Sequence, residues 1–216
     1  MASALCAMGA GIAFFFDPSH TATPGSDAYW RVLAQGSGAR TAFLACFAGS
    51  SLCAMGVVRA LRHLLRVPPA GWLDWLAQLG VLGLAVNAIS YVRLLGGESR
   101  RAAAYIQGDA ATQQAIASFS LVLDPQGWLT FGAVGLFLVC TNAVALRSRA
   151  WPRVLGALGI AFGTAYCFAL LSFVVGRADW VPLAVGAGAI GLGPLWWGGI
   201  AWVLWRTPDD HAARVE

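Results

Sequence analysis

Two long apolar runs joined by a basic turn constrain the fold of this chain most. Residues 128–146 and 154–175 contain no charged side chain, and the turn between them carries Arg147, Arg149 and Arg153. Because an α-helix rises about 1.5 Å per residue, about 20 apolar residues cross the roughly 30 Å hydrocarbon core of a bilayer. We therefore expect two membrane-spanning helices in a hairpin whose basic turn lies in the cytoplasm.

Composition extends this expectation to the whole chain. Of its 216 residues, 58% are hydrophobic and only 11% are charged, which is too apolar for a single soluble core. We predict an all-α fold, a polytopic transmembrane helical bundle that forms one transmembrane domain of about six spans. The four further spans are expected at residues 1–16, 41–61, 72–95 and 182–205, and the first of these is short.

The basic residues indicate how the bundle is oriented. All 14 are arginines, and the densest groups lie at residues 59–66 and 147–153. The positive-inside rule places both groups and both termini in the cytoplasm, with residues 93–126 outside. We predict that the protein lies in the inner (cytoplasmic) membrane of a bacterium. The net charge of +4 is spread over short segments, which argues against nucleic acid as a partner.

The longest connection between spans is the outer segment 93–126. Residues 99–106 and 109–123 both have a helical pattern, and the second stretch is amphipathic. We expect an interfacial helical segment here, which lies on the outer membrane surface or packs over the bundle as a lid. The polar residues 17–40 are expected to form a solvated loop with a short helix that ends near Ala34.

Four polar side chains within the expected spans are candidates for interhelical contacts, because such groups are costly in a membrane. Asp74 and Gln78 lie near the cytoplasmic end of the third span, where the N-terminal helix dipole favours a carboxylate. Asn87 and Asn142 lie deeper, on neighbouring spans. Since lipid offers an amide no partner, we predict that Asn87 bonds to Asn142, or alternatively to Thr141, as an architectural contact.

The second span ends in a group of basic residues. Arg59, Arg62, His63 and Arg66 are typical of a cytoplasmic helix end, and topology alone accounts for them. The alternative is a pocket for an anionic lipid head group, which basic side chains at a helix end form readily.

The last span is rich in glycine before Pro194 and rich in tryptophan after it, and we predict a kink at this proline. Ala187, Gly188, Gly191 and Pro194 are expected to form a groove that receives a partner helix or an elongated apolar ligand. The alternative is ordinary packing within the bundle. A further small-residue face is expected on the fifth span, at Gly156, Gly159 and Gly163.

No reaction chemistry is evident from motifs. The five cysteines lie in apolar runs without CxxC spacing, so we interpret them as packing residues. The chain has no HExxH motif, no glycine-rich phosphate loop and no convergent Ser, His and Asp set. We predict no catalytic residue, no metal site and no cofactor.

Two segments carry a family resemblance. LDPQGW at 123–128 opens the fourth span and WPRVLGALG at 151–159 opens the fifth. They resemble the pattern of a broad group of uncharacterised bacterial multi-pass membrane proteins with about six helices. The resemblance covers the last half of the chain and implies an architecture, but that group has no known activity to transfer.

Surfaces for helices and lipid without reaction chemistry are typical of an accessory protein. We predict an integral membrane accessory or assembly subunit, which packs against partner helices, lipid or an elongated hydrophobic ligand in a larger complex. Its predicted partners are membrane lipids and protein subunits. The alternative is a small transporter or carrier of a hydrophobic or small polar solute, because polar groups such as Asn87 and Asn142 would line a path.

Overall fold

The computed structural model describes residues 1–65 and 71–206, and every regular element in this part of the chain is a helix. Five helices are long and apolar enough to cross a membrane, and the shorter α1 is also apolar. The prediction of an all-α transmembrane bundle is confirmed. The apolar helices are α1 (Ala2–Phe16), α3 (Gly38–Leu64), α4 (Gly71–Gln107), η2 with α6 (Trp128–Ser148), α7 (Arg153–Val174), and α8, η4 and α9 together (Val181–Arg206).

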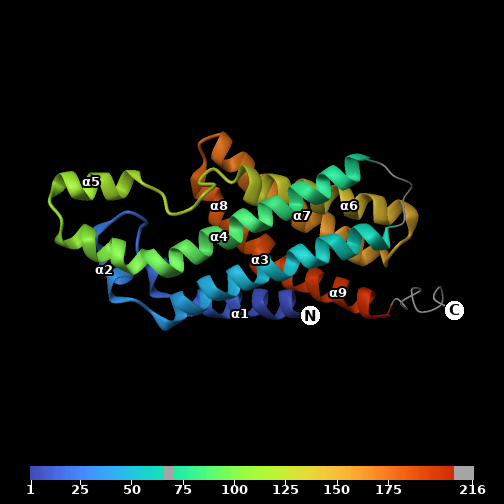
Figure 1. Ribbon diagram of the computed structural model, residues 1–216, viewed down its shortest axis with the longest axis horizontal. Coiled ribbons are helices and arrows are strands. Elements are labelled where there is room, and N and C mark those ends of the chain that lie inside the picture. The colour runs from blue at the N-terminus through green and yellow to red at the C-terminus, as the bar shows by residue number, and fades with distance from the viewer. Residues whose placement is uncertain (66–70, 207–216) are drawn as a thin grey trace.

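The apolar helices form a closed ring in the order of the chain. Each packs against the next, from α1 through α3, α4, α6 and α7 to α9, and α9 returns to α1. Figure 1 shows the elongated bundle that results, with α3 and α4 side by side along it. Helices that are consecutive in the chain are commonly adjacent in space in helical bundles. The ring encloses an interior to which every apolar helix contributes.

Glycines let the two helices of the central hairpin approach closely. A Cβ atom at Gly163 would lie 2.7 Å from the carbonyl oxygen of Gly135, and one at Gly159 would lie 2.3 Å from the side chain of Asn142. Gly156 is similarly close to a leucine of α6. The expected small-residue face on α7 is therefore confirmed, and it holds α7 against α6.

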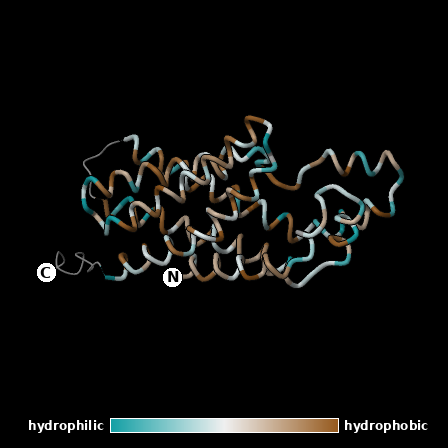
Figure 2. Tube along the Cα trace, turned by 180° about the vertical axis from the view of Figure 1, so that it is seen from behind, coloured by the Kyte–Doolittle hydropathy of each residue, from teal (hydrophilic) through white to brown (hydrophobic). Residues whose placement is uncertain are grey.

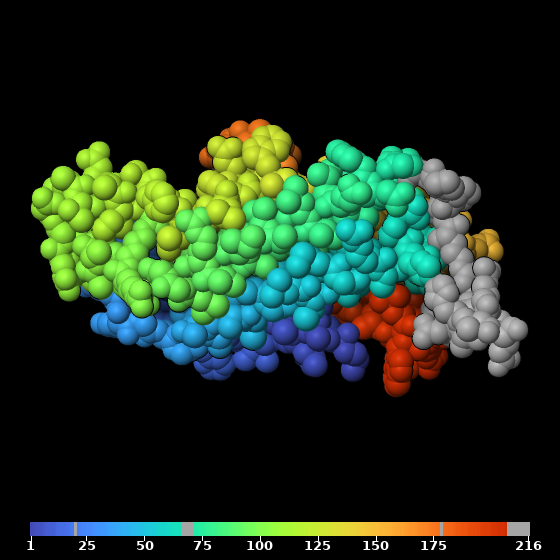
Figure 3. All heavy atoms as spheres, in the orientation of Figure 1, coloured from blue at the N-terminus to red at the C-terminus, as the bar shows by residue number. Residues whose placement is uncertain are grey.

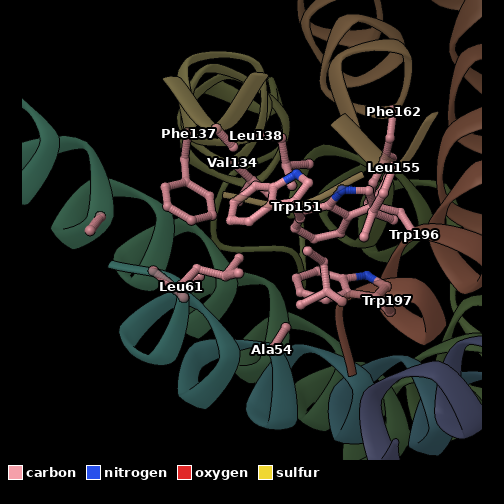
Figure 4. Close-up of a cluster of buried hydrophobic side chains, with 14 of the residues drawn as sticks. Ala54, Leu61, Val134, Phe137, Leu138, Trp151, Leu155, Phe162, Trp196 and Trp197 are labelled. Carbon is pink, nitrogen blue, oxygen red and sulfur yellow. The ribbon is translucent and has the colours of Figure 1, made fainter. Parts of the chain in front are cut away.

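Large side chains fill the ring beside its basic turns. Figure 4 shows Trp151, Leu155, Phe162 and Trp196 gathered in one buried cluster, to which Leu61 of α3 also belongs. Lipid tails are as apolar as these side chains, so the cluster holds the helices together through close van der Waals packing and not through exclusion of water. The fit between the side-chain shapes therefore contributes more to the stability of this cluster than their hydrophobicity does.

The fourth span begins with a turn of π-helix, η2 (Trp128–Ala133). Gly127 precedes it in a left-handed conformation, with a φ of 74°. The carboxylate of Asp124 accepts hydrogen bonds from the three successive backbone N–H groups of residues 128–130, at 2.7 to 3.0 Å. The LDPQGW segment thus caps the helix, because it satisfies N–H groups that would otherwise lack partners.

The last span contains a second π-helical stretch, η4 (Gly186–Leu192), between α8 (Val181–Val185) and α9 (Gly193–Arg206). It lies directly before Pro194, the residue at which we predict a kink. Proline donates no N–H to the preceding turn, so the backbone hydrogen bonds must rearrange there. Wide π-helical turns of this kind are often found at functional sites.

The end of the molecule opposite the basic turns, which we call the outer end after its predicted placement, differs from the sequence-based expectation. α4 continues for 37 residues through the stretch predicted to be a separate helix at 99–106, and at 1.5 Å per residue it is far longer than a bilayer core. The helix predicted at 109–123 is the shorter α5 (Ala110–Ser118), which runs back beside the end of α4 and not across the bundle axis (Figure 1).

The end of α4 and α5 form, with α2 (Asp27–Gln35), an extension that lies beyond the apolar bundle. Trp30 of α2 stacks on Tyr105 of α4 with ring centroids 4.6 Å apart. Figure 2 shows that hydrophilic residues are concentrated in this extension and at the basic turns, while the bundle between them is mostly apolar. Figure 3 shows α4, α3 and α1 covering one face of the molecule in adjacent rows. The elongated molecule therefore has two polar ends, and two 3₁₀ turns, Pro18–Thr21 and Ala178–Trp180, complete the connections.

Candidate functional sites

A cavity of about 30 Å³ lies inside the ring. Every apolar helix contributes to its lining, and none of the described residues around it is charged. In the order of the ring, the contributions include Ala7, Ser51, Asn87, Thr130, Tyr166 and Ala189. A buried water needs about 10 to 15 Å³ in this measure, so the cavity has room for about two waters or for a solute of similar size.

Polar side chains of α3, α4, η2, α7 and α9 line the interior cavity. Asn87 Nδ2 donates a hydrogen bond of 2.8 Å to Ser51 Oγ, and Ser51 donates in turn to the carbonyl oxygen of Phe47. Thr130 is 9% exposed, and its hydroxyl has no hydrogen-bond partner among the described residues. An unsatisfied buried hydroxyl costs about 1 to 3 kcal/mol. Thr130 therefore places a hydroxyl that has no partner among the described residues in the wall of the cavity.

Both π-helical stretches contribute to this cavity. Thr130 lies in η2 and Ala189 lies in η4. Irregular backbone is tolerated at membrane depth where it is buried in protein or lines a cavity, and broken helices commonly form the binding sites of transporters. Sequence reasoning missed this site, because Thr130 stands in an apolar run that otherwise reads as uniform helix.

A second polar site lies at the outer end of α3 and α4. Arg40 donates from Nε and Nη2 to the two carboxylate oxygens of Glu98, at 2.9 and 2.8 Å, and from Nη1 to Asp17 at 3.3 Å. Asp17 and Glu98 are both buried, and all three residues line a cavity of about 30 Å³. The prediction that residues 17–40 form a solvated loop is therefore wrong at Asp17. Burial and the charge of Glu98 raise the pKa of nearby Tyr29.

At the opposite end, an open cavity of about 420 Å³ lies between α3 and α4. Arg62 holds Asp74 through two hydrogen bonds, from Nε at 2.5 Å and from Nη2 at 3.2 Å. The basic residues at the end of the second predicted span therefore lie beside the polar residues at the start of the third, although the sequence did not connect these two groups. The cavity is lined by Arg59, Arg62, His63, Asp74, Ala77 and Gln78, and Arg66 lies outside the described residues.

The predicted bond between Asn87 and Asn142 is wrong. Asn87 faces α3 and bonds to Ser51, whereas Asn142 is fully buried, donates to the carbonyl oxygen of Leu138 and accepts from Trp196 Nε1 at 3.1 Å. The space for Asn142 comes from a glycine on α7, so its amide is directed across the hairpin toward α9. Asn142 remains an architectural contact, with a different partner.

We expect Asn142→Leu and Trp196→Phe to reduce the free energy of unfolding by about 1 to 2 kcal/mol each, because each leaves one buried polar partner unsatisfied. The double variant should lose less than the sum of the two, since the second change removes the orphaned group. Unfolding in mixed detergent micelles measures all three variants. Asn87→Leu combined with Asn142→Leu is the control pair and should be additive; coupling in that pair would contradict the observed contacts.

The expected groove at residues 187–194 is divided between two sides of the helix. Gly188 is buried, and a Cβ atom there would lie 3.1 Å from the ring of Tyr166 on α7. Ala187 and Gly191 are exposed on the other side, and Pro194 is half-buried. Gly188 therefore packs within the bundle, which is the alternative that the sequence left open for this residue.

These features define a polytopic helical membrane protein with an uncharged polar cavity inside its ring of helices. The chain matches a family model described as "Domain of unknown function (DUF4386)" over residues 3–206, and it belongs to that family. The match includes every apolar helix and confirms the resemblance to an uncharacterised family. No curated protein and no solved structure matches the chain. The bacterial origin and the cytoplasmic placement of the termini stay predictions.

Proposed function

We propose that this protein is a carrier, which binds a small uncharged solute in the interior cavity and moves it across the membrane. The observation that supports this most is the hydroxyl of Thr130, which has no hydrogen-bond partner among the described residues and lies in a π-helical turn that lines a polar cavity in the ring. Such a hydroxyl gains a hydrogen bond when a polar solute binds beside it.

The cavities are arranged in a sequence that suits transport. The three cavities described above use the pair α3 and α4: residues 37–44 with 94–99 at the outer end, 47–54 with 84–87 in the interior, and 59–63 with 74–78 at the basic end. Polar cavities thus lie at both ends and in the interior of one helix pair. Alternating access requires such an arrangement, with a central site that is reached from each side in turn.

Apolar side chains close the interior cavity toward both ends. On the outer side, Phe47 of α3 stacks on Tyr91 of α4, with ring centroids 5.0 Å apart, and this layer is about one helical turn thick. On the basic side, Val58 and Leu61 are fully buried against the main core. The conformation therefore corresponds to an occluded state, with a thinner barrier on the outer side.

The lining indicates the class of solute. The polar groups are an amide and hydroxyls, which serve as both donors and acceptors, and no described lining residue would neutralise an ion. A desolvated ion would be strongly disfavoured there, because burying an unpaired charge costs far more than burying a polar group. We therefore infer a small neutral solute with several hydrogen-bonding groups, of about the size of urea; the larger glycerol serves as a second probe.

The accessory function predicted from sequence has less support. It relied on a continuous groove at residues 187–194, and Tyr166 of the same chain already covers Gly188. The exposed faces of the bundle are also those that lipid would cover. No specific contact favours a partner subunit over lipid.

Thr130→Val tests the carrier function. In proteoliposomes, stopped-flow light scattering should show uptake of urea or glycerol about fivefold slower than in the wild type, since about 1 kcal/mol of hydrogen bonding is lost. The free energy of unfolding should be equal or greater, because the variant removes an unsatisfied buried hydroxyl. Thr141→Val is the matched control: Thr141 is buried and does not line the cavity. Wild-type vesicles no more permeable than protein-free vesicles to water, urea and glycerol would contradict the proposal.

A further inference from the structure

The open cavity at the basic end has an excess of positive charge. Arg59, Arg62 and His63 contribute basic groups from α3, and Asp74 is the one acidic residue among the described residues that line it. The turn between α6 and α7, which lies at the same end, adds further arginines. An anion that enters this cavity is therefore attracted both locally and by the surrounding surface.

The ion pair with Asp74 orients the guanidinium of Arg62 for binding an anion. It engages Nε and one N–H of Nη2, which leaves three of the five guanidinium donors for another acceptor. It also fixes the plane of the guanidinium, so less side-chain entropy is lost when an anion binds. Arg59 lies three residues earlier on the same helix face and is exposed. Together these two residues present a fork-shaped donor and a second positive charge at one opening.

The level at which the cavity lies in the membrane favours a lipid as its occupant. Trp72 and Trp75, on the same helical turn as Asp74, are 49% and 57% exposed. Exposed tryptophans of this kind lie at the level of the phospholipid head groups. The cavity thus opens where lipid phosphates are concentrated, and a soluble phosphate would have to compete with them.

An apolar path continues from the cavity toward the middle of the membrane. Leu52 lies seven residues before Arg59 on α3, and Leu82 lies four residues after Gln78 on α4, so helical spacing places each on a face that carries a cavity residue. Both leucines are exposed. Acyl chains attached to a head group in the cavity would pass over these two side chains.

We propose that this cavity binds the phosphate of an anionic phospholipid, held by Arg59 and Arg62, with the acyl chains against Leu52 and Leu82. The site is separate from the interior cavity, and it does not depend on the carrier function. Lipid bound here contacts both α3 and α4, the two helices along which all three cavities lie.

Native mass spectrometry of the full chain in mild detergent tests this proposal with phosphatidylglycerol and phosphatidylcholine as probes. The wild type should bind the first lipid at least about fivefold more tightly, and Arg59→Ala should reduce that affinity by about fivefold, since one arginine near the surface contributes roughly that factor. Arg31→Ala is the matched control, because it removes the same charge from an exposed site on α2.

Three outcomes would overturn the proposal. An equal loss of affinity in Arg31→Ala and Arg59→Ala would show general charge attraction without a site. Equal binding of the two lipids by the wild type would show that the head-group charge is not recognised. Complete displacement of phosphatidylglycerol by millimolar inorganic phosphate would assign the cavity to a soluble anion.

Discussion

Replacing Arg40 with leucine is expected to destabilise the protein by about 3 to 5 kcal/mol, the largest effect of any single substitution considered for the outer end. Asp17 and Glu98 are 4% and 8% exposed, and both bond to this one guanidinium. Removing the cation leaves the buried carboxylate of Glu98 without its two charge-assisted bonds and takes one cation away from the buried carboxylate of Asp17. Unfolding of the purified protein in mixed micelles measures the loss.

Two further variants separate charge from geometry at this site. Arg40→Lys keeps the charge but cannot make the two parallel bonds to Glu98, so its stability should lie between those of the wild type and the leucine variant. Replacing Arg40, Asp17 and Glu98 together with apolar residues should restore most of the loss, because no buried charge then remains. A loss below about 1 kcal/mol in Arg40→Leu would show that water reaches the carboxylates.

The position of the ion pairs of Arg40 with Asp17 and Glu98 explains why their loss should strongly destabilise the protein. Asp17 follows α1, Arg40 lies in the first turns of α3, and Glu98 lies in the part of α4 that continues beyond the bundle. One guanidinium therefore joins three segments at the point where the apolar ring meets the outer extension. The stacked rings of Trp30 and Tyr105 provide a second contact between that extension and α4.

The spans could be predicted from the sequence because the bilayer itself sets their length and polarity. A run such as 154–175 has few alternatives to a transmembrane helix, and glycines spaced along it indicate a close contact. The extent of α4 was harder to predict. The helix continues through Gly96 and Gly97, because a glycine within a helix costs only about 1 kcal/mol and contacts with α2 and α5 outweigh this cost.

The candidate sites could not be predicted to the same degree, because they depend on how each helix is rotated about its axis. Asn87 was expected to meet Asn142, but the face that carries it is directed toward Ser51. Arg40 and Glu98 are 58 positions apart, and no local pattern indicates that they pair. Thr130 resembles a core residue in the sequence, and only its missing partner marks it as part of a site.

The outer barrier of the interior cavity leads to the prediction with the largest effect on transport. Phe47 and Tyr91 stack at 5.0 Å, and Phe43 meets the edge of the Tyr91 ring at 6.2 Å. These rings lie between the interior cavity, which Phe47 lines, and the outer cavity, which Leu44 lines. In the proposed carrier, the outer cavity would connect to the interior cavity when the rings separate, so the contact energy of the rings would contribute to the cost of opening.

Tyr91→Leu should therefore increase the uptake rate of urea or glycerol by roughly tenfold. The substitution removes an aromatic stack worth about 0.5 to 1.5 kcal/mol and keeps an apolar side chain of sufficient size to preserve the bundle. Lowering the free-energy barrier to opening by about 1.4 kcal/mol increases the uptake rate about tenfold. Tyr91→Phe is the matched control: it keeps the ring, so its uptake rate should match that of the wild type.

A second measurement distinguishes an opened barrier from a leaky or unfolded bundle. In the Tyr91→Leu variant, the further change Thr130→Val should slow uptake of urea, because the solute still passes the interior cavity and still requires its hydroxyl. Passage through a disordered bundle would be insensitive to Thr130. An uptake rate in Tyr91→Leu equal to that of the wild type would place the rate-limiting step at the barrier on the basic side, where Val58 and Leu61 close the cavity.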